Sequence, residues 1–264
     1  MASSSLPDLP TTIDQTIVRL DGIVTRAITA NSRSGYFAAL YNRVTMAVRD
    51  GIRARAFDNN ERMERLDVVF ANRYIAASDR FTRGVSSPVS WRLAFEAGAR
   101  SDLSVVQHLL LGINAHINLD LGIACAEVAP GSAIDDLERD FNRINDVLAS
   151  LLPRVERQLT EISMLLGVAV DVADRFHDLD GRIGNFSLRK ARSSAWRFAR
   201  VLAQLDARLT REVAIAARDQ EIALLAFEVQ KPGPLSVALG GADWRNIAAH
   251  IRILASDDDG VVSA

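Results

Sequence analysis

Apolar residues recur every three or four positions along most of the chain, which is the period of an amphipathic helix. The first part of the chain holds three such segments, at residues 13–28, 35–57 and 59–81. A loop at residues 83–90, which contains Gly84 and Pro88, separates them from the next apolar series. No convincing alternation with a period of two is present, so the pattern predicts helices and no strand.

The remainder of the chain continues this pattern, with prolines and glycines at its breaks. Helices are predicted over residues 134–170, over 187–228 with a candidate interruption near 206–210, and over 244–255. Pro153 predicts a kink or a break in the first of these, because proline lacks a backbone N–H and clashes with the preceding turn. Asp243, at the end of a loop over residues 231–243, is the candidate N-cap of the last helix.

These segments predict a single all-α domain, a bundle of about seven to nine helices. No internal repeat and no change in composition marks a linker between domains. The expected organisation is a flexible N-terminal arm at residues 1–11, one all-helical domain at 12–256 and an acidic, frayed tail at 257–264.

Residues 103–127 are predicted to form the buried central helix of this bundle. Apolar side chains cover nearly its whole circumference, and a helix that is apolar all round is normally buried. Ser101 or Asp102 is the candidate N-cap, and the Pro130-Gly131 pair is expected to end the helix.

Polar residues interrupt this apolar helix in an ordered way. One row repeats at four-residue steps: His108, Gly112, His116 and Asp120. Residues at that spacing share a helix face, so His116 and Asp120 are close enough to touch or to share a ligand. Gly112 leaves room beside the row, either for close helix packing or for a ligand. A buried polar group without a partner costs about 1–3 kcal/mol, so we expect the polar residues of this row to have hydrogen-bond partners or to bind a ligand.

We expect this row to form the functional site of a small-molecule enzyme. His116 is the candidate general base or metal ligand, Asp120 orients it or shares the metal, and His108 is a further candidate catalytic residue. The expected reaction is hydrolysis or acid–base chemistry, including cyclisation, on a partly apolar substrate. Candidate substrate-binding residues are Asn114, Asn118, Asp67, Tyr74, Trp91, Asp140 and Asn145.

A divalent metal ion, zinc or iron, is the candidate cofactor, because imidazole nitrogens and carboxylate oxygens bind such ions. Its candidate ligands are His108, His116, Asp120 and His177. The alternative is a non-catalytic helical ligand-binding protein. In that interpretation the row is a structural polar network, and Asn114 and Asn118 lock neighbouring helices.

Three segments carry a resemblance to a known family. They are LDVVFANRYIAA at residues 66–77, HLLLGINAHINLDLGIA at 108–124 and DFNRINDVLASLLPRV at 140–155. With the WRFAR of residues 196–200, they resemble the helical family designated domain of unknown function 5995, over about residues 60 to 225. The resemblance implies an all-helical, enzyme-like domain and carries no activity with it.

A second resemblance covers only LGINAHINLD, which is similar to the LG-x-x-x-H-x-x-x-D segment of zinc-dependent phospholipase C proteins. That resemblance implies His116 and Asp120 as metal ligands. The chain departs from the pattern after Asp120, where no further histidine and no His-x-x-x-Glu follows. A trinuclear zinc site is therefore not expected, and a mononuclear or dinuclear site with His108 or His177 stays open.

Composition narrows the expected partners. The net charge is -2 over 264 residues, which gives no bulk attraction to nucleic acid. Cys125 is the only cysteine, so a disulfide within the chain is excluded. Without a secretory signal pattern or 18 uninterrupted apolar residues, we expect a cytoplasmic protein with no integral membrane segment. A small-molecule substrate is the expected partner, and a homodimer stays open.

Two further groups have two interpretations each. Aromatic residues concentrated between Tyr36 and Phe95 predict core packing or a pocket for an apolar ligand. The basic run over residues 182–200, which includes Arg192, predicts a solvated face or, alternatively, a phosphate site.

Overall fold

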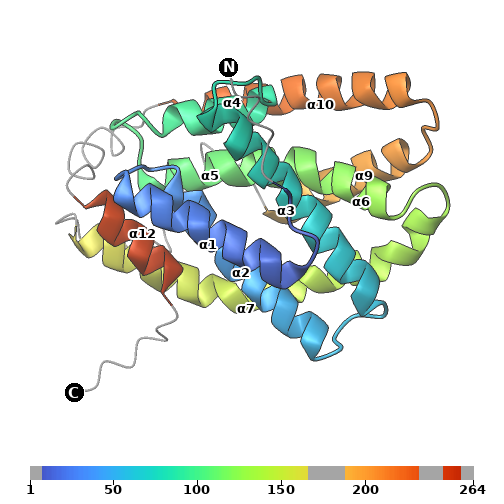
Figure 1. Cartoon of the computed structure of the whole chain (residues 1–264), viewed down its shortest axis with the longest axis horizontal. Helices are drawn as coiled ribbons and strands as arrows, with labels where there is room; N and C mark the ends of the chain where they lie inside the picture. The colour runs from blue at the N-terminus through green and yellow to red at the C-terminus, as the bar shows by residue number, and fades with distance from the viewer. Residues whose placement is uncertain (1–7, 166–187, 232–245, 257–264) are drawn as a thin grey trace.

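The computed structural model describes residues 8–165, 188–231 and 246–256, and this part of the chain is helical without strands (Figure 1). The elements are α1 (Ile13–Thr29), α2 (Gly35–Arg53), α3 (Asn60–Thr82), α4 (Val89–Ala97), α5 (Val105–Ala115), the π-helix η1 (His116–Asp120), α6 (Leu121–Val128), α7 (Ala133–Leu165), α9 (Leu188–Ala203), α10 (Arg208–Val229) and α12 (Ile247–Ala255). Counted with α5–η1–α6 as one continuous helix, the described residues form nine helices, which confirms the predicted all-α bundle.

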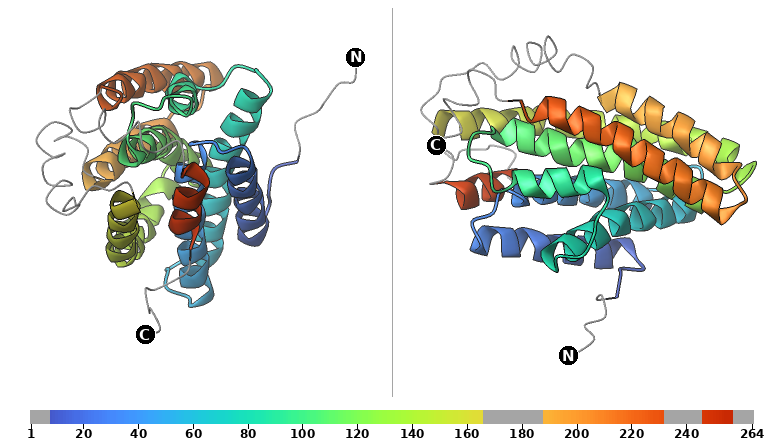
Figure 2. Two further views of the ribbon diagram at one scale, coloured as in Figure 1. Left: turned by 90° about the vertical axis from the view of Figure 1, so that its left-hand side faces the viewer. Right: turned by 90° about the horizontal axis from the view of Figure 1, so that it is seen from above.

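The continuous α5–η1–α6 stretch is the central helix, as predicted. In Figures 1 and 2, α10 lies on one side of it and α7 on the other. It packs against α10, α4 and α2 through α5, and against α9 and α3 through α6. The view from above in Figure 2 shows most helices running along the long axis of the molecule.

Capping side chains determine where several helices begin. Thr12 accepts a hydrogen bond from the backbone N–H of Gln15 at the start of α1. The central helix begins at Val105, after Ser104, whose side chain and that of Gln107 form a reciprocal capping box. The predicted caps, Ser101 and Asp102, were therefore wrong. Two free backbone N–H groups are satisfied together at Ser104, and neither earlier residue offers that pairing.

The predicted breaks are partly confirmed. Residues 204–207 separate α9 from α10, which overlaps the interruption expected near 206–210 and begins two residues earlier. Gly131, with a φ of 60°, lies in the turn between α6 and α7, as the Pro130-Gly131 pair predicted. The helix α7 continues through Pro153, so the predicted alternative of a break was wrong. The end of the predicted helix at 166–170, the cap Asp243 and the acidic tail lie outside the described residues.

The last residues of the predicted N-terminal arm are held against the bundle. Pro10 is buried, and its carbonyl oxygen accepts a hydrogen bond from Asn72 Nδ2 at 2.8 Å. The anchored part of the chain therefore begins before Ile13, and residues 1–7 of the arm lie outside the described residues.

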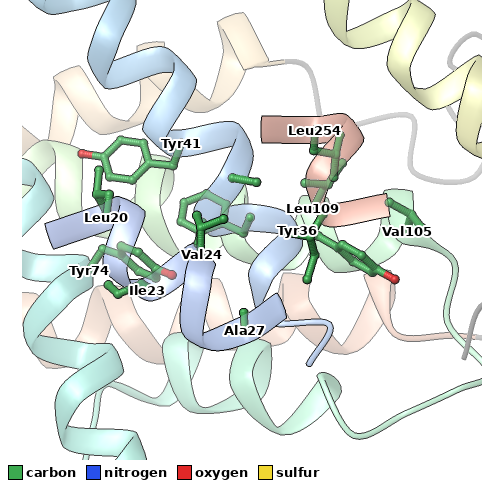
Figure 3. Close-up of a cluster of buried hydrophobic side chains, with 14 of the residues drawn as sticks. Leu20, Ile23, Val24, Ala27, Tyr36, Tyr41, Tyr74, Val105, Leu109 and Leu254 are labelled. Carbon is green, nitrogen blue, oxygen red and sulfur yellow. The ribbon is translucent and has the colours of Figure 1, made fainter. Parts of the chain in front are cut away.

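Two large apolar clusters form the core. The first joins α1, α2, α3, α4, α5, α7 and α12, and the second joins α3, η1, α6, α7, α9 and α10. Figure 3 labels part of the first cluster: Leu20, Ile23, Val24, Ala27, Tyr36, Tyr41, Tyr74, Val105, Leu109 and Leu254. Most of the aromatic residues from the first third of the chain therefore pack in the core, and Cys125 lies fully buried in the second cluster.

The stretch Val105–Val128 is long and apolar enough to cross a membrane by length and composition alone. In the structure, 83% of its most apolar window is buried inside the protein, which is the behaviour of a core helix.

Candidate functional site

Asp120 is the centre of a buried polar cluster on the central helix. Its side chain is 1% exposed. Its Oδ2 accepts a hydrogen bond from Trp91 Nε1 at 2.7 Å, and its Oδ1 accepts one from Arg73 Nε at 2.9 Å. The indole of Trp91, a predicted substrate-binding residue, is thus engaged with Asp120. Trp91 and Arg73 therefore fix the position of the carboxylate next to His116.

His116 lies next to this carboxylate. Its Nδ1 is 3.4 Å from Asp120 Oδ2, and its ring stacks on Phe70 with centroids 3.6 Å apart and planes 7° from parallel. Its buried Nε2 has no hydrogen-bond partner among the described residues. Burial lowers the pKa of His116 and outweighs the hydrogen bond to Asp120, which raises it, so the imidazole is neutral near pH 7.

The residues from His116 to Asp120 form a single π-helical turn. At its end the backbone N–H of Leu121 donates to the carbonyl oxygen of His116. Such insertions are rare in α-helices and frequently occur at functional sites. A regular helix was predicted here, because residue spacing carries no signal that distinguishes a π turn from an α turn.

A cavity of about 340 Å³ lies between the central helix, α2, α3 and α7. Most of its wall is aliphatic and aromatic, with Leu40, Val44, Leu109, Ile113, Ile144 and Leu148 among the lining residues. Among the described residues, the ionisable or polar side chains in the wall are Tyr41, Asp67, His116 and Arg192. The cavity therefore combines a large apolar surface with a few polar groups, as small-molecule sites usually do.

Asp67 contributes a carboxylate to this wall. The side chain is 7% exposed, and its buried Oδ2 has no hydrogen-bond partner among the described residues. Burial raises the pKa of Asp67 to about 7, with a smaller contribution from Glu64. The pKa of Tyr41 is raised well above its ordinary value, first by burial and then by Asp67. Near neutral pH, Asp67 can therefore donate or accept a proton.

Arg192 is the cationic group of the described part of the wall, and it is the exception to the predicted solvated basic face. The other basic residues of the run that the structure describes, Arg189, Lys190, Arg197 and Arg200, are exposed as predicted. The side chain is 4% exposed, with Nε 2.7 Å from Asn145 Oδ1 and Nη2 2.5 Å from the carbonyl oxygen of Phe141. Burial lowers its pKa to about 10. Asn145, a predicted substrate-binding residue, thus positions Arg192.

His108 does not line this cavity. A Cβ added at Gly112 would lie 2.4 Å from Cγ of Phe37, so the ring of Phe37 fills the space between the two histidines. His108 lies beyond it, next to Tyr36 and a hollow of about 20 Å³. The room at Gly112 is therefore used for close helix packing.

The predicted metal ligands are only partly brought together. His116 and Asp120 are adjacent, whereas no group of three histidine, cysteine, aspartate or glutamate side chains within the described ranges is arranged to hold a metal ion. His177 lies outside the described residues. The zinc or iron site stays a prediction.

The remaining predicted substrate-binding residues have structural partners and lie outside the wall of the 340 Å³ cavity. Asn114 Nδ2 donates to the carbonyl oxygen of Ile222 at 3.1 Å, and Asn118 Nδ2 donates to Asn114 Oδ1 at 2.9 Å. Asp140 accepts from the backbone N–H groups of residues 58 and 59 at 2.7 and 3.0 Å, just before α3. Tyr74 packs against Phe37 in the core.

The predicted site residues did not include Tyr41, Phe70 and Arg192, the wall residues that matter most for the chemistry. Arg192 had a signal in the sequence, because Ala195 and Ala199 follow it at helical spacing and a small-residue face of this kind is normally buried. Tyr41 and Phe70 belong to the aromatic group between Tyr36 and Phe95, for which a pocket for an apolar ligand was one of the two interpretations.

Comparison with known proteins adds a family and no activity. The family model described as "Family of unknown function (DUF5995)" matches residues 13–232, which is most of the chain. No curated protein and no solved structure gives a significant match. The match includes the central helix, His116, Asp120 and every wall residue named above. The chain therefore belongs to the DUF5995 family of unknown function.

Proposed function

We propose that the chain is an enzyme that binds a small, partly apolar molecule in the 340 Å³ cavity and carries out acid–base chemistry on it. His116 is the general base of this proposal. The observation that carries it is the pairing of His116: Nδ1 faces a carboxylate, while the buried Nε2 has no partner among the described residues. The volume supports the proposal, because small-molecule sites commonly measure about 300–1,000 Å³.

The chemistry follows from the position of the imidazole proton. When Nδ1 carries the proton, it donates to Asp120 Oδ2, and the lone pair on Nε2 is available to accept a proton from a substrate. The negative charge of Asp120 then stabilises the imidazolium that forms. Trp91 and Arg73 hold that carboxylate in place, so they act as positioning residues.

Asp67 supports the same proposal from another part of the wall. Because its pKa is about 7, it exists in both protonation states near neutral pH. In a hydrolysis, His116 would take a proton from the attacking water as its oxygen bonds to the substrate carbon, and protonated Asp67 would give a proton to the leaving group as its bond to that carbon breaks. In a cyclisation, a hydroxyl or amino group of the substrate would take the place of the water. The zinc or iron cofactor is not needed for these proton transfers.

A non-catalytic ligand-binding protein is the second candidate function. The observation that favours it is the cover over His116: Phe70 stacks on the ring, and Tyr41 meets it with centroids 4.3 Å apart. Nε2 itself is buried, so substrate contact with it requires a neighbouring side chain to move. In this alternative, the Asp120 cluster ties α3 and α4 to the central helix.

Binding is tested with the neutral dye Nile red, whose fluorescence rises in an apolar site. Leu148→Trp, which fills the cavity from α7, is expected to reduce dye affinity at least about 10-fold, a change of about 1.4 kcal/mol. Leu224→Trp is the matched control, because Leu224 is 66% exposed on α10. Equal affinities of the two variants would contradict binding in this cavity.

Catalysis is tested with hydrolysis of 4-nitrophenyl octanoate. His116→Gln is expected to lower the rate at least about 100-fold while Nile red still binds, since general-base catalysis contributes about 10²–10⁴-fold. His250→Gln is the matched control, because His250 is fully buried on α12 and lies outside the cavity. Equal hydrolysis by the wild type and His116→Gln, or dye binding without hydrolysis, would favour the non-catalytic candidate.

A further inference from the structure

Arg192 is a buried cation whose hydrogen-bond partners among the described residues are all uncharged. Its Nε and Nη2 donate to an amide oxygen of Asn145 and a backbone oxygen of Phe141, and its Cζ lies 4.3 Å from the centre of the Phe141 ring. No aspartate or glutamate of the described residues forms an ion pair with it. A buried charge normally has a counter-ion, because desolvation without one is costly.

The guanidinium retains capacity for an anion. Nη1 has no hydrogen-bond partner within the described ranges. The lowered pKa of Arg192, about 10, reflects burial that no neighbouring carboxylate offsets. The ring of Phe141 and the side chain of Asn145 hold the group rigidly, so an anion would meet a fixed donor.

The position of Arg192 in the cavity is also informative. Leu152 and Leu188 belong to the cavity wall and are 53% and 38% exposed, so the cavity reaches the surface beside them. Arg192 lies one helical turn after Leu188 on α9. A positive charge therefore lies just inside the opening, and an apolar wall continues beyond it.

We propose that the cavity binds an aliphatic monocarboxylate, with the carboxylate paired to Arg192 and the chain against the apolar wall. This inference rests on the proposed function in one respect, because it uses the same cavity. It adds the chemical class of the ligand and assigns Arg192 as the residue that selects it. The remaining ionisable wall groups are compatible with an anion: His116 is neutral, and Asp67 loses its charge as it binds a proton with a pKa of about 7.

The inference is tested by displacement of Nile red with three ligands of equal chain length: dodecanoate, 1-dodecanol and dodecylamine. Wild-type protein is expected to bind dodecanoate about 10–100-fold more tightly than dodecanol, the effect of one charge-assisted hydrogen bond. Dodecylamine is expected to be the weakest of the three, because its ammonium group would face Arg192.

Arg192→Met is expected to abolish the preference for dodecanoate and to leave dodecanol affinity within about 3-fold, because methionine retains an apolar stem over Phe141. Arg218→Met is the matched control. Arg218 also stacks on a phenylalanine, Phe198, but it pairs with Glu221 and lies outside the cavity wall. Its variant is expected to keep the wild-type preference.

The outcomes separate the two proposals. Failure of both dodecanoate and dodecanol to displace the dye from wild-type protein would overturn the cavity itself and the inference with it. Displacement by both with equal affinity would leave the cavity as a binding site and overturn the role of Arg192. Tighter binding of dodecylamine would show that Asp67 selects the ligand instead. Because the wild-type comparison alone decides these outcomes, the test holds even where Arg192→Met fails to fold.

Discussion

Buried polar groups are hydrogen-bonded on one side of the central helix and partly without hydrogen-bond partners on the other. On the side of α10, Asn114 and Asn118 are hydrogen-bonded to each other, to the carbonyl oxygen of Ile222 and, through a backbone oxygen, to Arg218. On the side of the cavity, His116 Nε2 and Asp67 Oδ2 have no hydrogen-bond partner in the described part of the chain. The first side joins two helices, and the second side leaves hydrogen-bonding capacity beside an open volume.

This difference separates structural from functional candidates better than residue type does. Buried polar groups in folded proteins are nearly always paired, so a paired asparagine is explained by the fold alone. Unpaired groups that line a cavity require another explanation, which a bound ligand supplies. Substitutions on the α10 side should therefore change stability, and substitutions on the cavity side should change binding or its dependence on pH.

The largest expected effect is the loss of the carboxylate that supports His116. Asp120→Ala leaves Arg73, Trp91 and His116 without their common partner, and removing one partner of a buried ion pair costs about 3–5 kcal/mol. Urea denaturation of the wild type and variant measures this change in the free energy of unfolding.

The control for this prediction is Asp102→Ala. Asp102 pairs with Arg100 where both side chains are partly exposed, at 43% and 35%, so its removal is expected to cost less than about 1 kcal/mol. Similar losses in the two variants would contradict the central place of Asp120 in the buried cluster.

The second-largest expected effect is a gain in the free energy of unfolding, caused by Asp67→Asn, and its size depends on pH. The pKa of Asp67 is about 7 in the folded protein and near 3.8 in the unfolded chain, so the folded state binds the additional proton between these values. Stability from this group is complete below pH 3.8 and falls as the pH rises towards 7. Between pH 5 and pH 8 the wild type should lose about 2–3 kcal/mol relative to Asp67→Asn.

Denaturation of both proteins at the two pH values gives this difference directly. Glu64→Gln is the control, because Glu64 contributes less to the raised pKa of Asp67 than burial does. A wild type and an Asp67→Asn variant with parallel pH profiles would show that the pKa of Asp67 is not raised.

A smaller loss is expected on the α10 side. Asn114→Ala removes the hydrogen bond to the carbonyl oxygen of Ile222 and leaves Nδ2 of Asn118 without its partner, at a cost of about 2 kcal/mol. Nile red affinity should stay within about 2-fold, because Asn114 does not line the cavity. A marked loss of dye binding in a folded Asn114→Ala protein would erase the distinction between the two sides of the helix.

The parts of the fold that follow from local periodicity could be predicted from the sequence. The apolar circumference of residues 103–127 identified the central helix, and the four-residue step from His116 to Asp120 identified their contact. The cavity could not be predicted, because it depends on which faces of α2, α3 and α7 meet the central helix and how completely their side chains fill the space. For the same reason, the sequence could not show that His116 lines the cavity and His108 does not, because both belong to the same row at four-residue steps.

The last and smallest effect concerns the residue that separates these two histidines. A Cβ at position 112 would lie 2.4 Å from Phe37, so Gly112→Ala forces the Phe37 ring to shift. Overpacking of this kind costs about 1–3 kcal/mol, and the helix propensity of alanine returns about 1 kcal/mol, which leaves a net loss of about 1 kcal/mol. Phe37 also lines the cavity, so its shift should change Nile red affinity. Gly22→Ala on α1 meets no atom closer than 3.6 Å, so it should gain about 1 kcal/mol from the helix propensity of alanine and leave dye affinity unchanged. A Gly112→Ala protein with unaltered dye binding would mean that Phe37 moves away from the cavity and towards His108, where the hollow of about 20 Å³ could receive it.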